Sequence, residues 1–217
     1  MTLTKRLIRE VEEYRFAYLT YLQRYDALPG DDPRAAARWP RTLNGNGDGI
    51  ISGNYDDAPP ADGVPLSITP SYGESLNFWS HLRLATLVTD GAENGAGQPV
   101  NFVGGIAGVQ QSGYGMRGPL VCLDQVPPGV AALLDRTLDD GDAKSGSVRG
   151  NIDPYQPLGH TYSHLEGDYV SCISLGGGAS GSPRPLFHYE PDTPVRHPNA
   201  HGRNPNARRG NPNAGDS

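Results

Sequence analysis

An amphipathic repeat in the first 25 residues limits the possible folds more than any other pattern in this sequence. Apolar and aromatic side chains recur three or four positions apart between Leu3 and Tyr25, in a stretch that contains neither Gly nor Pro. This spacing is typical of one buried face of an α-helix. The sequence therefore predicts a single helix over 3–25 whose inner face consists of Leu3, Leu7, Val11, Tyr14, Tyr18, Tyr21, Leu22 and Tyr25.

The start of this helix is abrupt. The amphipathic pattern is already in full register at Leu3, and no capping box precedes it. We therefore expect residues 1–28 to be the lower part of a longer helix.

The following 160 or so residues should form one domain with both helices and strands, because a typical domain contains roughly 100–200 residues. Two further helices are predicted, over Glu74–Val88 with Ser71 in a capping box, and over Gly129–Leu138. The intervals between the predicted strands are too short for regular helical crossovers, so the sheet should be antiparallel and the fold α+β. The predicted strands are Val100–Ile106, Leu120–Asp124, Ser147–Arg149 and Tyr169–Leu175.

Composition excludes several classes of protein. The formal net charge of -6 argues against nucleic-acid binding by the folded part of the chain. The 29 Gly and 20 Pro residues indicate a loop-rich fold, and no run of apolar residues reaches the roughly 18 that a membrane helix needs. A repeated Pro-Asn-Ala motif, as in HPNAHGR and NPNARRG, predicts a disordered tail over 191–217.

An Asn- and Asp-rich loop is the candidate metal site. Asn44, Asn46 and Asp48 alternate ahead of a Gly, as in the first half of a Ca²⁺-binding loop, and Ile50 would offer its carbonyl. The position where a bidentate Glu should complete the loop holds Tyr, so Asp56 or its neighbour Asp57 would have to substitute. The alternative is an Asn-Gly turn held by its own side-chain hydrogen bonds.

A second acidic cluster follows the short helix and comprises Asp135, Asp139, Asp140 and Asp142. Carboxylates at a helix C-terminus are unfavourable unless they are solvated or neutralised. We expect them to be exposed, with a shared cation as the alternative.

Catalytic motifs are weak. The run GASGSP resembles the nucleophile turn of serine proteases, with Ser180 as nucleophile and His81, His160 or His164 as base. No activating segment surrounds these histidines, and the G-x-G-x-x-G run that overlaps Ser180 is followed by prolines rather than a helix. We therefore predict no enzymatic activity and keep a Ser180 hydrolase as a third possibility.

The two cysteines, Cys122 and Cys172, lie in strand-like runs. Two buried thiols in a cytosolic protein and one disulfide in an oxidising compartment are both compatible with that pattern.

The order of features resembles that of the type IV pilin-like proteins, the pilins and pseudopilins of bacterial fibres and type II secretion. The resemblance covers residues 3–175 and is carried by the long helix, a late cysteine and four segments: RYDALPGDDPRAAARW, NGNGDG, GESLNFWSHLRLATLV and LLDRTLDDGDAKSGSVRG. It implies a lower helix over 1–28, a globular head over 29–190, and a tail over 191–217 that has no counterpart in the family.

The resemblance implies a structural subunit of a pilus or secretion pseudopilus. Such proteins carry an apolar, membrane-inserted segment ahead of the helix, which this sequence lacks, so we expect either the soluble part of a filament subunit or a divergent member that does not polymerise. The expected partners are other pilin-like subunits, the assembly machinery and the inner membrane, with no nucleic acid bound by the head.

The resemblance also bears on location and on the two candidate sites. It implies a head in the periplasm or in an extracellular filament, a disulfide between Cys122 and Cys172, and possible Ca²⁺ binding in the head. The alternative function is a secreted Ca²⁺-dependent binding module that uses loop 44–57.

Overall fold

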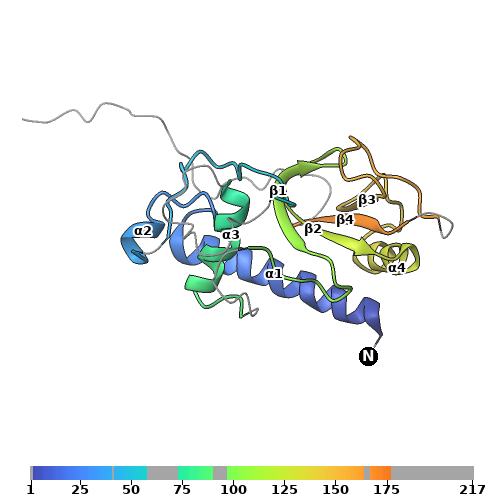
Figure 1. Cartoon of the computed structure of the whole chain (residues 1–217), viewed down its shortest axis with the longest axis horizontal. Coiled ribbons are helices and arrows are strands. Elements are labelled where there is room, and N and C mark those ends of the chain that lie inside the picture. The colour runs from blue at the N-terminus through green and yellow to red at the C-terminus, as the bar shows by residue number, and fades with distance from the viewer. Residues whose placement is uncertain (1, 41, 58–72, 90–96, 164–166, 177–217) are drawn as a thin grey trace, which may run out of the picture. The chain divides into compact units, whose positions relative to one another are not determined.

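A computed structural model describes residues 2–40, 42–57, 73–89, 97–163 and 167–176, all of which belong to one compact unit, Met1–Pro183. The fold is α+β, as predicted, and Figure 1 shows how the elements are arranged. The predicted tail over 191–217 and the Ser180 turn lie outside the described residues. The elements in chain order are α1 (Leu3–Tyr25), α2 (Ala35–Arg38), α3 (Glu74–Leu84), β1 (Ala107–Gly113), β2 (Met116–Val126), α4 (Pro128–Leu138), β3 (Val148–Asn151) and β4 (Tyr169–Ser174).

The strands form one four-stranded antiparallel sheet in the order β1-β2-β4-β3, which confirms the predicted strand direction. The predicted strand over Val100–Ile106 is wrong, because only an isolated bridge joins its two ends and β1 starts at Ala107. The Asn101 carboxamide explains the difference. It accepts from the backbone N–H of Val103 and Gly105, and it donates to the carbonyls of Ile106 and Asp124. These bonds close the segment into a turn.

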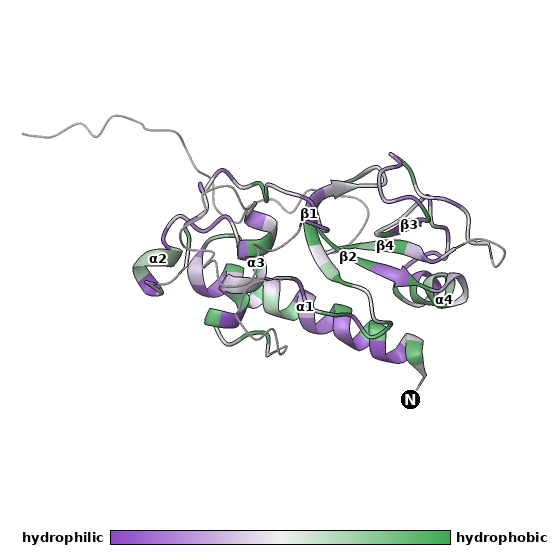
Figure 2. Ribbon diagram, in the orientation of Figure 1, coloured by the Kyte–Doolittle hydropathy of each residue, from purple (hydrophilic) through white to green (hydrophobic). Residues whose placement is uncertain are grey.

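One face of the sheet shares a core with α1, α3 and α4. The Tyr14 ring meets Trp79 edge-on at 4.8 Å between centroids, and Tyr18 stacks on Phe78 at 6.3 Å. Leu7 and the other inner residues of α1 are buried in the same core, and Figure 2 shows the alternation of apolar and polar residues along the helix. The predicted helix over 3–25 is therefore confirmed in extent, and its inner face is confirmed except for Leu3, which is 40% exposed at the start of the helix.

The N-terminal caps of α1 and α3 compare with the predictions in different ways. As expected, α1 starts without a capping box, because Lys5 stands where the box needs Glu or Gln. Thr2 caps α1 through an Oγ1 that accepts from the Lys5 N–H at 3.4 Å. The N-cap of α3 is Gly73, which makes no side-chain bond, and the predicted capping residue Ser71 lies outside the described residues. The same helix ends at Leu84 rather than Val88, because Thr86 adopts a left-handed backbone with φ 57°.

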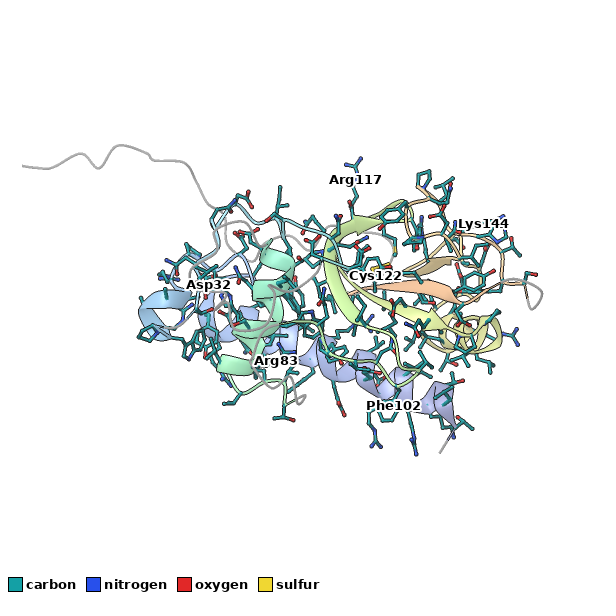
Figure 3. The ribbon with its side chains drawn as sticks, in the orientation of Figure 1. Asp32, Arg83, Phe102, Arg117, Cys122 and Lys144 are labelled. Carbon is teal, nitrogen blue, oxygen red and sulfur yellow. A yellow bond between two sulfur atoms is a disulfide. The ribbon has the colours of Figure 1, made fainter. Side chains whose placement is uncertain are left out.

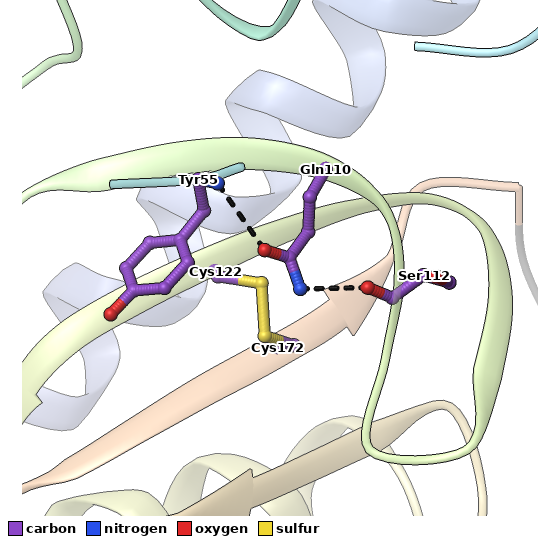
Figure 4. Close-up of a disulfide and its surroundings, with 5 residues drawn as sticks. All are labelled: Tyr55, Gln110, Ser112, Cys122 and Cys172. Atoms are coloured by element: carbon purple, nitrogen blue, oxygen red, sulfur yellow. Dashed lines mark hydrogen bonds between the residues drawn. A yellow bond between two sulfur atoms is a disulfide. The ribbon is translucent and has the colours of Figure 1, made fainter. Parts of the chain in front are cut away.

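The other face of the sheet carries a smaller core that contains the Cys122–Cys172 disulfide. The two cysteines are directly opposite each other on β2 and β4, with their Cα atoms 3.9 Å apart. Tyr55 lies beside the disulfide, as Figure 4 shows, and its backbone N–H donates to the Gln110 side chain at 3.2 Å. The predicted disulfide is thus present and joins the two central strands.

In the described part of the chain, no helix combines the length and apolarity required to cross a bilayer.

Candidate functional site

Three carboxylates meet beside the predicted metal loop. Asp31, Asp48 and Glu74 each place one oxygen within 4.8 Å of the others. Asp31 and Glu74 are buried, with 3% and 7% of their surface exposed, whereas Asp48 is exposed. Oxygen donors of this kind suit hard divalent cations such as Ca²⁺.

The loop folds around these carboxylates through its backbone N–H groups. Asp31 accepts from the N–H of Gly47 at 2.5 Å and of Gly49 at 2.8 Å. Glu74 accepts from the N–H of Asn46 at 3.0 Å and of Ser52 at 2.9 Å. The buried acids therefore fix the conformation of the loop that follows α2.

The pKa of Asp31 is raised to about 6, mainly by burial and to a smaller extent by the nearby charges of Glu74 and Asp48. The N–H groups of Gly49 and Gly47 act in the opposite direction because they stabilise the ionised form. Removal of this carboxyl from water is therefore the largest cause of its raised pKa.

Only part of the predicted ligand set lies at this cluster. Asn46 donates through Nδ2 to Asp48 at 2.9 Å, so these two residues belong to it. The Asn44 side chain instead accepts from the Ala36 N–H at 2.8 Å, at the start of α2. The Ile50 N–H donates to Asp48 at 2.8 Å, and Asp56 accepts from the Tyr155 hydroxyl at 3.0 Å. The Asn-Gly turn bonds expected as the alternative are present as well.

Sequence reasoning missed Asp31 and Glu74, which are the two buried members. Asp31 stands in the turn after α1 and Glu74 is the first residue of α3, so only the folded chain brings them to the loop. The acidic character of DALPGDDP was the available signal, but nothing in the sequence pairs it with a residue beyond 57.

The second acidic cluster is partly buried, and the expectation that it is exposed is wrong for Asp135. The Asp135 carboxylate accepts from the Tyr162 hydroxyl at 2.9 Å and from the Gly141 N–H at 3.0 Å, and burial raises its pKa. Asp139 accepts from the N–H groups of Ser147 and Val148. These bonds hold the connection between α4 and β3.

His81, a candidate base, is fully buried and both ring nitrogens have partners. Nδ1 accepts from the Gly30 N–H at 2.9 Å, and Nε2 lies 2.9 Å from the Leu43 carbonyl, to which it donates. Burial lowers its pKa to about 4, so the imidazole is neutral. Its geometry is that of a structural bridge between α3 and the segments that precede and follow α2.

A groove of about 760 Å³ runs along α1. Three apolar side chains that line the groove are largely exposed to solvent: Phe16 by 71%, Val100 by 73% and Phe102 by 52%. The Arg6 guanidinium lies 5.2 Å from the centre of the Phe102 ring. The lining residues are Arg6, Arg9, Glu10, Glu13, Tyr14, Phe16, Leu87, Val88, Thr89, Val100 and Phe102.

A buried carboxylate joins this groove to the core. Glu10 accepts from the Tyr14 hydroxyl at 2.9 Å and from the Phe102 N–H at 3.1 Å. Burial raises the pKa of Glu10, while both hydrogen bonds act to lower it. The turn that carries Phe102 is thereby fixed against α1.

The outer side of α1 is also apolar in part. Phe16 and Leu19, exposed by 71% and 49%, lie almost one turn apart and opposite the buried positions of the helix. Arg15 nevertheless reaches the end of β4, where its guanidinium donates to the Ser174 carbonyl at 2.9 Å. The helix is thus attached to the sheet while two large apolar side chains face away from it.

Comparison of the chain with protein-family models, curated proteins and solved structures gives no match.

Proposed function

We propose that this chain is the head of a type IV pilin-like filament subunit, with a structural rather than a catalytic role. The observation that supports the proposal best is that α1 has apolar residues on both its buried and its exposed side. Its inner face is part of the main core, while Phe16 and Leu19 remain open on its outer side. A helix of this kind can hold its own head and still contact another subunit.

The inner contacts make α1 a rigid extension of the head. Tyr14 and Tyr18 pack on Trp79 and Phe78 of α3, and Arg15 donates to a carbonyl at the end of β4. A force or a displacement applied to the helix would therefore reach the sheet directly. This rigidity suits a subunit that stacks with copies of itself through its N-terminal helix.

The outer contacts would supply the association. Exposed aromatic and aliphatic side chains gain free energy when a neighbour covers them, at about 25 cal/mol per Å² of apolar surface. Arg9 and Glu13, which line the same groove, would set the register between copies. A head-to-tail contact of this type does not close on itself and generates a helical filament.

The proposed location is the cell envelope, with the head outside the cytoplasm. The Cys122–Cys172 disulfide is consistent with an oxidising compartment. In this proposal an apolar segment ahead of α1 anchors the subunit in the inner membrane before assembly.

Photo-crosslinking in the native cells tests the proposal. A photoreactive amino acid at Phe16 should yield a ladder of crosslinked copies, whereas the same group at Leu133, exposed by 49% on α4, should not. Mass measurement and N-terminal sequencing of the native protein should find an apolar segment with a methylated N-terminus. Monomers only, or a mature chain that starts at Met1, would contradict the proposal.

A second candidate is a secreted Ca²⁺-dependent binding module. The convergence of Asp31, Asp48 and Glu74 at loop 44–57 favours it. In that case removal of Ca²⁺ would abolish ligand binding and leave the Phe16 crosslinks unchanged.

A further inference from the structure

A second hollow, of about 460 Å³, lies at the β1–β2 hairpin, away from the groove along α1. Figure 3 shows Arg117, which lines the hollow, and Phe102, which lines the groove, on opposite sides of the view. The hollow is lined by Asn54, Tyr55, Asp56, Gln110, Ser112, Gly113, Tyr114, Gly115, Met116, Arg117, Pro154, Tyr155, Gln156 and Pro157. Segments from three distant parts of the chain therefore meet there.

Two tyrosines and a methionine form its buried wall. Tyr55, Tyr114 and Met116 belong to the small core that surrounds the disulfide. Tyr114 has a left-handed backbone with φ 48°, followed by Gly115 with φ 79°, so the hairpin turn holds an aromatic residue where Asn is normally favoured. The Tyr114 residue is 97% buried, since 3% of its surface is exposed, and its hydroxyl has no hydrogen-bond partner in the described part of the chain.

A third tyrosine stands at the rim. Tyr155 is 79% exposed, yet its hydroxyl donates to Asp56 at 3.0 Å and its backbone N–H donates to Asp153 at 3.0 Å. The neighbouring Gln156 donates to the same Asp153 at 2.9 Å. These hydrogen bonds hold the Tyr155 residue in place, while its exposed ring remains accessible to a ligand.

The polar groups around the hollow are of two kinds. The Gln110 carboxamide is fixed, because it accepts from the Tyr55 N–H and donates to the Ser112 carbonyl at 2.7 Å, as drawn in Figure 4. Asn54 and Arg117 make no side-chain bond to any residue that the structure describes. Their amide and guanidinium groups can bond a ligand without breaking an existing contact.

We propose that this hollow binds a saccharide unit. A pyranose ring combines an apolar face of C–H groups, which packs on an aromatic ring, with hydroxyls that both donate and accept. Tyr155 supplies an anchored ring, and Asn54 and Arg117 supply free planar polar groups beside it. Open, partly polar hollows with a few fixed aromatic rings suit such a ligand better than a purely apolar one.

Two other ligand classes fit less well. A phosphorylated ligand would be repelled by the Asp56 carboxylate. Among the lining residues, Arg117 alone offers a positive charge to offset that repulsion. A peptide added as a strand would need the open side of β1, where the Tyr55 and Ile51 N–H groups already donate to Gln110 and Gln111. The Tyr55 carbonyl also lies where a Cβ on Gly108 would be, 1.8 Å from it, so that side is covered.

Saturation-transfer NMR on the full chain tests the proposal, with cellobiose, lactose and N,N′-diacetylchitobiose as probes and a glycan array as a wider screen. At least one saccharide should receive saturation at its ring C–H protons, with millimolar affinity. Tyr155→Ala should reduce that signal at least tenfold, and Leu133→Ala, which removes an exposed side chain on α4, should leave it unchanged. Tyr155→Phe keeps the ring but loses the Asp56 anchor, so an intermediate loss is expected.

Two results would overturn the proposal. One is the absence of binding to the three probes and to the array. The other is a saccharide signal that Tyr155→Ala does not change, which would place any binding elsewhere. If Tyr155→Ala shifts the unfolding midpoint, Asn54→Ala takes its place, because Asn54 is exposed and its side chain holds no other residue.

Discussion

His81 is a neutral, fully buried side chain whose two ring nitrogens are both hydrogen-bonded inside the protein. Its pKa is about 4 in the folded state against an ordinary value of 6.5. The neutral form is therefore favoured by folding. The stability it contributes is present above pH 6.5 and is lost progressively as the pH falls from 6.5 to about 4.

A His81→Gln variant isolates this effect. Because the variant does not titrate here, the difference in free energy of unfolding between wild type and variant should shrink by roughly 3 kcal/mol between pH 7 and pH 4. Urea denaturation at a series of pH values measures it. Asp31, whose raised pKa of about 6 makes the native state gain stability as the pH falls below 6, cancels in this comparison. A constant difference would mean that His81 is not buried as described.

At the scale of single residues, the sequence predicted which residues carry polar ligand atoms better than it predicted which residues those atoms contact. It identified Asn46 and Asp48 as candidate Ca²⁺ ligands or, alternatively, as members of a hydrogen-bonded Asn-Gly turn, because alternating Asn and Asp before Gly is a local pattern. It could not identify Asp31 or Glu74, whose role depends on α1 and α3 packing together. The Tyr155–Asp56 bond spans 99 positions and leaves no local signal at all.

Among the secondary-structure elements, β2 and β4 form the centre of the sheet and are joined by the Cys122–Cys172 disulfide. The two cysteines are 50 residues apart in the chain, and closing a loop of that length restricts the unfolded state by about 4 kcal/mol in the chain-entropy model.

The double variant Cys122→Ala, Cys172→Ala should therefore lose about 4 kcal/mol of unfolding free energy, less any relief of strain. Urea unfolding of the variant and of the oxidised wild type, under identical conditions, measures the loss. Reductant added to the folded wild type is a control, because both sulfur positions are buried and reduction should follow unfolding. Equal midpoints for variant and wild type would refute the prediction.

The loop 44–57 makes the second prediction at this scale. Two buried carboxylates and Asp48 repel one another, and a bound divalent cation would offset that cost. We expect Ca²⁺ to raise the melting temperature, by an amount that grows with the logarithm of its concentration. Asp48→Asn should weaken the Ca²⁺ effect, since Asp48 is exposed and its replacement costs little in the apo protein. An equal melting temperature in Ca²⁺ and in EDTA would contradict the prediction and show that the backbone N–H groups alone offset the repulsion among the carboxylates.

The elements themselves were predicted unevenly for a physical reason. Helix α1 carries a strong apolar periodicity, and β2 and β4 contain the short apolar runs LVCL and YVSCI, so these three elements could be located from the sequence. Strand β1, AGVQQSG, is rich in Gly and Gln and owes its extended form to pairing with β2. The Tyr114-Gly115 turn between them lacks the Asn or Asp that marks most two-residue hairpins, so no local pattern predicts it.

For the whole head, the proposed assembly surface on α1 and the proposed saccharide hollow are separate. Their labelled members, Phe102 and Arg117, lie on opposite sides of the view in Figure 3. A filament that covered the first would leave the second open to the outside.

Separate sites should respond separately to substitution. Phe16→Ala should weaken copy-to-copy crosslinking from a photoreactive group at Leu19 and leave saccharide binding unchanged, while Tyr155→Ala should do the reverse. Crosslinking in cells and saturation-transfer NMR on the same pair of variants measure the two effects. If either variant impairs both functions, the two surfaces are coupled through the head.

The position of the disulfide also determines how the head behaves under mechanical tension. If the chain is pulled by α1 at one end and beyond β4 at the other, the force passes directly from β2 to β4 through the two sulfur atoms. The 50-residue interval between them, which includes α4 and β3, is bypassed and cannot be stretched. Reduction would release about 170 Å of additional extended length. In the proposed filament, part of every subunit would therefore stay folded even when its other contacts are pulled apart.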